Sequence, residues 1–306
     1  MSKVTICIPT FRRPQGLAKA LEAVARLETA HDVRVIVADN DAEGRAGFAL
    51  CEQMKPAYRW PLDSVVVSAR GIAQNRNALV EQAMRDPQME YLVMFDDDEW
   101  PVSGWLDALI DTQRATSADA VAGSVQREFE VPPGRLANHC DGICEVRGKT
   151  GPAHEIDSTA NVLICRSILN EGRRFDLGFA LTGGEDREFF TGMARDGKRF
   201  AFSDEAVVYA YVPASRGSLK WGLQRAYRAG NSDMRVMLKY GLSVRQRMVE
   251  TAKIVGAILT APFAIVLFAA NARRAADAIR RVFRASGKLA AVFGSHYNEY
   301  AVTHGK

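Results

Sequence analysis

Four consecutive acidic residues, Asp96 to Glu99, follow the apolar run Tyr91–Phe95. Adjacent like charges repel one another, so such a run needs solvent or a cation to compensate it. Hard divalent cations such as Mg²⁺ and Mn²⁺ prefer carboxylate oxygens. Asp96 and Asp98 are two residues apart, and on an extended segment they face the same side and could share an ion. The alternative is a solvated acidic turn that caps a helix beginning near Ser103.

A second acidic pair, Glu185-Asp186, follows two glycines and opens an apolar helical pattern. The glycines permit a close approach of the backbone, and acidic residues suit the positive end of a helix. Helix capping is therefore one interpretation of the pair. The other is catalytic, with one carboxylate acting as a general base that takes a proton from a substrate hydroxyl.

Strand and helix patterns alternate around these residues and would position them. Strands are expected over residues 4–8, 33–38, 64–67 and 91–95, and helices over residues 14–25, 43–54 and 73–84. This alternation predicts an α/β fold with a mainly parallel sheet and helices on both faces. Ligands of such sheets bind beyond the carboxyl ends of the strands, which is where Asp39-Asn40-Asp41 and Asp96 to Glu99 fall.

The sequence contains neither a GxxxxGKS/T loop nor a GxGxxG loop. A bound nucleotide would therefore need a metal ion to hold its diphosphate. The segment Gly71 to Asn77 begins a predicted helix, and its Arg76 could approach a phosphate or a base. An arginine on a helix is also a common surface feature, and that interpretation stays open.

Charge is distributed unevenly along the chain of 306 residues, whose net charge is +4. From Arg216 to Lys288 there are 15 basic and three acidic residues, so the remainder is acidic. Within the basic part, Ile254 to Ala270 carries no charge, but as a helix it would reach only about 25 Å, short of the roughly 30 Å core of a bilayer. We expect an interfacial or re-entrant segment, followed by an amphipathic helix from Arg273 to Arg284 that lies on phospholipid. The alternative for this helix is a core helix with a solvated basic flank.

Apolar residues interleaved with basic ones favour a membrane partner over nucleic acid. No signal peptide is visible at the N-terminus, and the five cysteines are irregularly spaced, so we expect reduced thiols in the cytoplasm. A metal site at Cys140 and Cys144 is disfavoured because no second cysteine pair completes it.

Five motifs together resemble the family-2 glycosyltransferases. They are, in order, the opening strand Val4–Pro14, the strand end Val37-Ala-Asp-Asn-Asp41, the segment Gly71–Asn77, the string Phe95-Asp-Asp-Asp-Glu-Trp-Pro101, and Gly183-Gly-Glu-Asp186. The resemblance covers about residues 3–212 and is greatest to the branch that builds bacterial exopolysaccharides of the succinoglycan type. It implies a GT-A fold, and it implies transfer of a sugar from a nucleoside diphosphate with inversion at the anomeric carbon.

The resemblance also implies roles for individual residues. Asp186 would be the general base, Asp98 the main metal ligand, and Asp96 a residue near the ribose or the metal. Asp39 would accept a hydrogen bond from a uracil ring. The remaining site residues are expected at the nucleotide, namely Thr10, Arg12, Arg76 and Asp97, or on the acceptor side, namely Glu185 and Trp221.

These elements predict a GT-A domain over residues 1–215 and a helical, membrane-associating region over residues 216–306. Processive synthases carry a QxxRW motif, of which only a fragment is present around Gln224 to Arg228, so we expect transfer of a single sugar. The expected donor is a UDP-sugar with Mg²⁺ or Mn²⁺. The expected acceptor is a lipid-linked saccharide met at the inner leaflet, on the cytoplasmic face of the cell membrane, where the protein is peripheral or shallowly inserted. Two alternatives are a non-catalytic nucleotide-binding membrane scaffold and a metal-dependent phosphotransferase with Asp96 as nucleophile.

Overall fold

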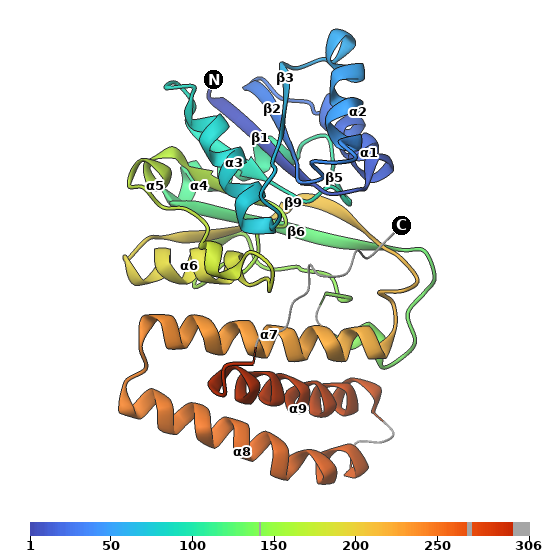
Figure 1. Ribbon diagram of the computed structural model, residues 1–306, viewed down its shortest axis with the longest axis vertical. Helices are drawn as coiled ribbons and strands as arrows, with labels where there is room; N and C mark the ends of the chain where they lie inside the picture. The colour runs from blue at the N-terminus through green and yellow to red at the C-terminus, as the bar shows by residue number, and fades with distance from the viewer. Residues whose placement is uncertain (141, 268–270, 296–306) are drawn as a thin grey trace. The chain divides into compact units, whose positions relative to one another are not determined.

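The computed structural model describes residues 1–140, 142–267 and 271–295 (Figure 1). The chain forms two compact units. The first contains Met1–Gln126 and Val146–Ala210, and the second contains Arg127–Glu145 and the helices that follow Tyr211. The division lies near the expected boundary at residue 215, except that residues 127–145 join the C-terminal helices.

The N-terminal half of the first unit alternates strands and helices, as expected. Its strands are parallel and lie in the order β3-β2-β1-β4. The elements are β1 (Lys3–Thr10), α1 (Pro14–Ala25), β2 (Asp32–Asp39), α2 (Ala46–Met54), η1 (Lys55–Ala57), β3 (Leu62–Val66), α3 (Ile72–Met84) and β4 (Tyr91–Met94).

The second half of this unit extends the sheet with antiparallel pairs such as β4–β8 and β6–β8. The predicted α/β class is therefore confirmed, whereas the sheet is mixed, because β8 runs antiparallel to both of its neighbours. The elements are β5 (Glu99–Pro101), α4 (Trp105–Thr116), β6 (Ala120–Phe129), β7 (Gly151–Ala153), β8 (Val162–Cys165), α5 (Arg166–Asn170), η3 (Leu177–Phe179), α6 (Glu185–Arg195) and β9 (Phe200–Val212).

The sheet is buried on both faces, which explains why its central strands are continuous apolar runs. Successive residues of β1 point to opposite faces. Ile6 and Ile8 join one core cluster with Leu17 of α1, and Cys7 joins the other with Leu79 of α3. Helices therefore cover both faces and hold the strand ends in place.

The ends of the parallel strands meet at one edge of the sheet. Thr10 at the end of β1 is in register with Asp39 at the end of β2, and Cys7 is in register with Met94 at the end of β4. The residues that follow β4, Asp96 to Glu99, therefore leave the sheet at the same edge as Thr10 and Asp39.

The second unit contains η2 (Ala137–His139) and the helices α7 (Leu219–Tyr240), α8 (Val244–Leu267) and α9 (Ala272–Val292). Helix α9 lies between α7 and α8 (Figure 1). Glycines bring α7 and α9 close together, since a Cβ on Gly287 would lie 1.8 Å from the carbonyl oxygen of Tyr227. Arg284 and Asp233 add an ion pair of 2.5 Å between the same helices.

This packing corrects the prediction that Arg273 to Arg284 lies on phospholipid. That segment belongs to α9, whose Ala276 is fully buried, so it is a packed helix with a basic flank. The predicted apolar segment Ile254 to Ala270 falls in α8 as far as Leu267, and its last three residues lie outside the described part. Among the residues that the structure describes, no helix combines the length and apolar character required to cross a bilayer.

Candidate active site

The loop between β1 and α1 is anchored on Asp97. The Asp97 carboxylate accepts hydrogen bonds from Thr10 Oγ1 at 2.7 Å and from Arg13 Nη1 at 3.0 Å. Asp97 is 4% exposed, and burial raises the pKa of its carboxyl to about 6, although Arg13 opposes this rise. The prediction placed Thr10 and Asp97 at the nucleotide; in the structure they bond to each other and hold the loop.

The acidic run alternates between partly exposed and buried carboxylates. Asp97 and Glu99 are buried, whereas the side chains of Asp96 and Asp98 are 36% and 20% exposed. Glu99 Oε2 accepts the backbone N–H of Asp96 at 3.0 Å and closes the turn. Arg13 Nη1 also lies 2.9 Å from Asp98 Oδ2. Asp96 and Asp98 are thus the more open carboxylates of the run, although residues 97 and 98 form a turn and not the extended segment that the prediction assumed.

The end of β2 organises two neighbouring loops. Asp39 accepts backbone N–H groups of Asp41 and Phe48 at 2.9 and 3.0 Å, which fixes the start of α2. Arg12 forms two contacts of 3.1 Å with Asp41, and its hydrogen bond lowers the pKa of the Asp41 carboxyl. Asn40 Nδ2 donates to the carbonyl of Ala69 at 2.8 Å, and Asn40 Oδ1 accepts from Gly71 N at 2.8 Å. The predicted contact between Asp39 and a uracil ring stays a prediction.

Helix α3 begins at Gly71, whose φ of +144° lies in a region that side chains rarely adopt. The next residue, Ile72, donates its N–H to the carbonyl of Ala180 at 3.1 Å, which joins α3 to the segment before α6. Asn75 Nδ2 donates to the carbonyl of Thr10 at 3.3 Å. Its Oδ1 atom is buried without a hydrogen-bond partner among the described residues, so a ligand or water would complete it.

Arg76 joins the two acidic motifs. Its guanidinium donates from Nη1 to Glu185 Oε1 and from Nη2 to Asp96 Oδ1, the latter at 3.2 Å. The side chain is 5% exposed, and its guanidinium lies 5.9 Å from the ring of Phe175. Residues 71–77, 96–99 and 183–186 are thereby held together by one buried cation.

The acidic pair at the start of α6 has two different environments. Gly183 and Gly184 both have positive φ, 74° and 93°, and turn the chain so that the pair opens the helix. Glu185 is 2% exposed, and burial raises the pKa of its carboxyl to about 7, although Arg76 opposes the rise. Asp186 is partly exposed, accepts the N–H of Arg187 at 2.8 Å, and also has a raised pKa because its carboxyl is desolvated. Asp186 is therefore the more accessible carboxylate, and the burial of Glu185 differs from its predicted place on the acceptor side.

The donor set around Asp96 and Asp98 fits a divalent cation. Magnesium at phosphate sites uses one or two carboxylates and takes further oxygens from phosphates and water. Within the described ranges, no cluster of three or more His, Cys, Asp or Glu residues could hold an ion by itself. Two partly exposed carboxylates at a strand end match a cation that a bound diphosphate would help to coordinate.

Nine of the ten predicted site residues lie in the first unit, and Trp221 belongs to the second. Trp221 packs partly buried against a small cluster that contains Cys140 and Ile143, with Arg225 5.5 Å from its ring. Its acceptor role stays a prediction. Arg13, Asn40 and Asn75 were not singled out from the sequence, although each lies beside a residue that was.

Comparison with known proteins decides the family. The family model described as "Glycosyl transferase family 2" matches residues 5–162, which contain β1, β2 and the acidic run. The chain belongs to glycosyl transferase family 2. This glycosyltransferase is 33% identical over 294 residues to the succinoglycan biosynthesis protein ExoM of Rhizobium meliloti strain 1021, covering 95% of this chain and 93% of that protein.

Solved structures show that the glycosyltransferase has the expected GT-A fold. Staphylococcus aureus TarS 1-349 in complex with UDP aligns with a TM-score of 0.52 at 13% identity, covering 97% of this chain and 93% of that one. The mannosyltransferase PcManGT of Pyrobaculum calidifontis, in complex with GDP-Man and Mn²⁺, aligns with a TM-score of 0.55 at 16% identity, covering 97% and 77%. A longer TarS structure is matched over 40% of its chain.

Proposed function

We propose that this glycosyltransferase moves one sugar from a nucleoside diphosphate sugar, with inversion, to a hydroxyl of a lipid-linked saccharide in exopolysaccharide assembly. The bridge of Arg76 between Asp96 and Glu185 carries the proposal. It fixes the carboxylates expected at the diphosphate relative to the acidic pair expected at the acceptor. In-line displacement needs groups held on both sides of the reacting carbon, and a rigid connection between them supports that chemistry.

Asp98 and Asp96 would hold a divalent cation against the donor diphosphate, where its charge would stabilise the departing nucleotide. Asp186 is the residue that takes the proton from the acceptor hydroxyl. Its pKa is raised toward the working pH. A general base is most effective there, because its carboxylate is still ionised and accepts a proton more readily. Glu185 is buried on Arg76 and acts by holding that arginine, which leaves the proton transfer to its neighbour.

The relatives support the substrate classes at a coarser level. One TarS structure is a complex with UDP-GlcNAc, and the mannosyltransferase structure is a complex with GDP-Man and Mn²⁺. A relative named for succinoglycan biosynthesis supports a role in assembling an exopolysaccharide. We propose a UDP-sugar as donor, Mg²⁺ or Mn²⁺ as metal, and action at the cytoplasmic face of the cell membrane, where a lipid-linked acceptor would be met.

The first experiment is donor hydrolysis, because such transferases can pass the sugar slowly to water. Purified protein is incubated with UDP-, GDP- and TDP-sugars and Mn²⁺ or Mg²⁺, and the released nucleoside diphosphate is measured. Wild type should release one nucleotide in a metal-dependent reaction. Asp186→Asn should lower the rate by about 10²–10⁴-fold and leave donor affinity within about threefold, since a general base contributes to turnover rather than to ground-state binding.

Asp98→Ala should lose metal-dependent release, and Asp111→Asn is the matched control because Asp111 is an exposed carboxylate on α4. Nucleotide binding without turnover, with and without a lipid-linked acceptor, would contradict the proposal and favour the non-catalytic scaffold. Release of inorganic phosphate instead of a nucleoside diphosphate would favour the phosphotransferase.

A further inference from the structure

Helix α8 exposes its large apolar side chains. Residues at spacings of four and seven lie along one side of a helix, and six such residues of α8 form what we call the outward face. Phe263, Leu259 and Met248 are 78%, 65% and 68% exposed. The outward face consists of Val244, Met248, Val255, Leu259, Phe263 and Leu267.

The opposite side of α8 contains Ile254, which packs in a buried cluster with Met234 and Ala285, together with small and charged residues. Glu250 is buried and accepts hydrogen bonds from Lys288 of α9 at 2.5 Å and from Lys253 at 2.8 Å. Burial alone would raise the pKa of the Glu250 carboxyl, but the two lysines hold it below its ordinary value. Ala261 is also buried. Helix α8 thus buries Ile254, Ala261 and an ion pair on its inner side, and exposes most of its large apolar groups on the outward face.

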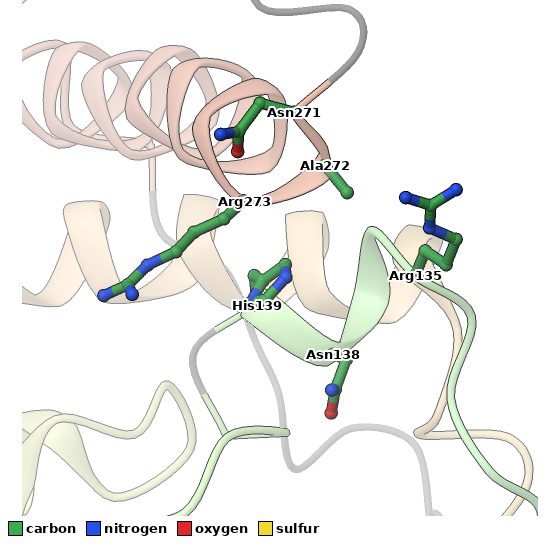
Figure 2. A pocket seen from close by; sticks show the side chains of 6 residues that line it. All are labelled: Arg135, Asn138, His139, Asn271, Ala272 and Arg273. Atoms are coloured by element: carbon green, nitrogen blue, oxygen red, sulfur yellow. The ribbon is translucent and has the colours of Figure 1, made fainter.

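Basic residues flank the beginning of the outward face. Arg245 and Arg247 flank its first turn and are exposed, and neither forms an ion pair with a described residue. A separate basic group lies at the start of α9, where Arg273 borders an open cavity of about 430 Å³. Figure 2 shows Arg273 and Arg135 at opposite sides of this cavity, with His139 between them. An apolar stripe with two exposed arginines at its first turn has the charge and polarity of a surface that meets acyl chains and anionic headgroups.

We propose that the outward face of α8 docks on an anionic lipid bilayer, with the helix lying in the interfacial plane and the arginines at the level of the phosphates. The purpose of this docking rests on the proposed function, because docking would hold the transferase where a lipid-linked acceptor is met. A second copy of the chain is a poorer occupant. The outward face contains no acidic residue, so the same face of a second copy would offer no anion to compensate Arg245 and Arg247.

The test is flotation of the purified full-length chain with vesicles of neutral phosphatidylcholine and with vesicles that contain 30% phosphatidylglycerol. Neither a donor nor an acceptor is needed. Wild type should float with the anionic vesicles and much less with the neutral ones. Met248→Ser/Leu259→Ser/Phe263→Ser should weaken binding by at least about 100-fold, since each buried methylene contributes to membrane affinity. Arg245→Gln/Arg247→Gln should weaken it by about fivefold per arginine, the effect of one charge near an anionic surface.

The matched control is Val131→Ser/Leu177→Ser/Leu238→Ser, because these side chains are 54%, 57% and 46% exposed and lie on other elements. The control should float like wild type. Unfolding curves and donor hydrolysis of the face variant should match wild type, which separates loss of docking from loss of folding or of catalysis. Failure of the donor panel alone would refute the proposed function and leave the docking result standing.

Three results would overturn the docking proposal. Wild type could fail to bind either vesicle, or the face variant could float as well as wild type. Sedimentation could show a wild-type dimer that the face substitutions convert to a monomer, with no flotation by either. That last result would assign the outward face to a second copy of the chain.

Discussion

Replacement of Arg76 by methionine is the sharpest test of how the site is held together. Arg76 is 5% exposed and donates to Glu185, which is 2% exposed, and to Asp96. Methionine retains much of the side-chain volume and removes the charge. Removing one partner of a buried ion pair leaves an uncompensated charge and costs about 3–5 kcal/mol. Typical folding stabilities are about 5–15 kcal/mol, so we expect a large fraction of the total to be lost.

The assay is urea unfolding at pH 8, followed through the fluorescence of tryptophan. Trp105 is fully buried in the first unit and reports on the core beside the site. With a slope of about 3 kcal/mol per molar urea, a loss of 3 kcal/mol moves the midpoint down by about 1 M. The slope itself should stay constant, because the same surface is exposed on unfolding.

A double-mutant cycle with Glu185→Gln isolates the contact between the two side chains. In the double variant neither a buried cation nor a buried anion is left at this contact, so the two losses should not add. We expect a coupling energy of about 1–3 kcal/mol. A loss below about 1 kcal/mol for Arg76→Met, together with coupling below about 0.5 kcal/mol, would refute the view that this guanidinium binds the two acidic motifs together.

Two further predictions concern the titration of the buried carboxylates and the packing of Gly16 against the acidic run. The raised pKa values of Glu185, about 7, and Asp97, about 6, mean that the folded state holds protons that the unfolded state has already lost. The stability that these two protonated carboxyls contribute is present below about pH 4 and is lost as the pH rises through 6 to 7. The melting temperature of Glu185→Gln should therefore rise relative to that of wild type between pH 5 and pH 8. A difference that stays constant over this range would contradict the prediction. Gly16→Ala should destabilise by about 1–3 kcal/mol in urea titration, because its Cβ would lie 2.6 Å from the carbonyl oxygen of Asp97. Gly256→Ala in α8 is the control: open space surrounds that position, so stability should increase by about 0.5–1 kcal/mol.

In the parallel half of the fold, the ends of the strands could be predicted from the sequence to within about two residues. The expected strand 33–38 is observed as Asp32–Asp39, and the helix expected from residue 14 begins at Pro14. Apolar runs separated by helical patterns suffice there, because consecutive elements pack beside each other. The antiparallel pairing of β8 was missed because β8 pairs with β4 and β6 across long stretches of chain, and apolar periodicity does not encode a strand's partner.

In the site, the residue types could be predicted from the sequence, whereas the partners and the burial of their side chains could be predicted only in part. The four adjacent carboxylates at a strand end were visible in the sequence. The turn at residues 97 and 98, in which Asp97 is buried against Thr10 and Arg13, was not. The partner of Glu185 was not visible either, because Arg76 lies 109 positions away and only the folded chain brings the two together.

The separation of roles within the acidic pair depends on that distant arginine. Adjacent carboxylates in one environment would compete for the same proton and the same partner. Here Arg76 engages Glu185 in the interior, while the turn through Gly183 and Gly184 leaves Asp186 partly exposed on the next position of α6. Two titratable groups in different environments can take different functions, one structural and one chemical. The assignment of Asp186 as base therefore rests on where the neighbouring carboxylate is held, and loss of Arg76 should weaken catalysis through the position of the pair even though the arginine itself transfers no proton.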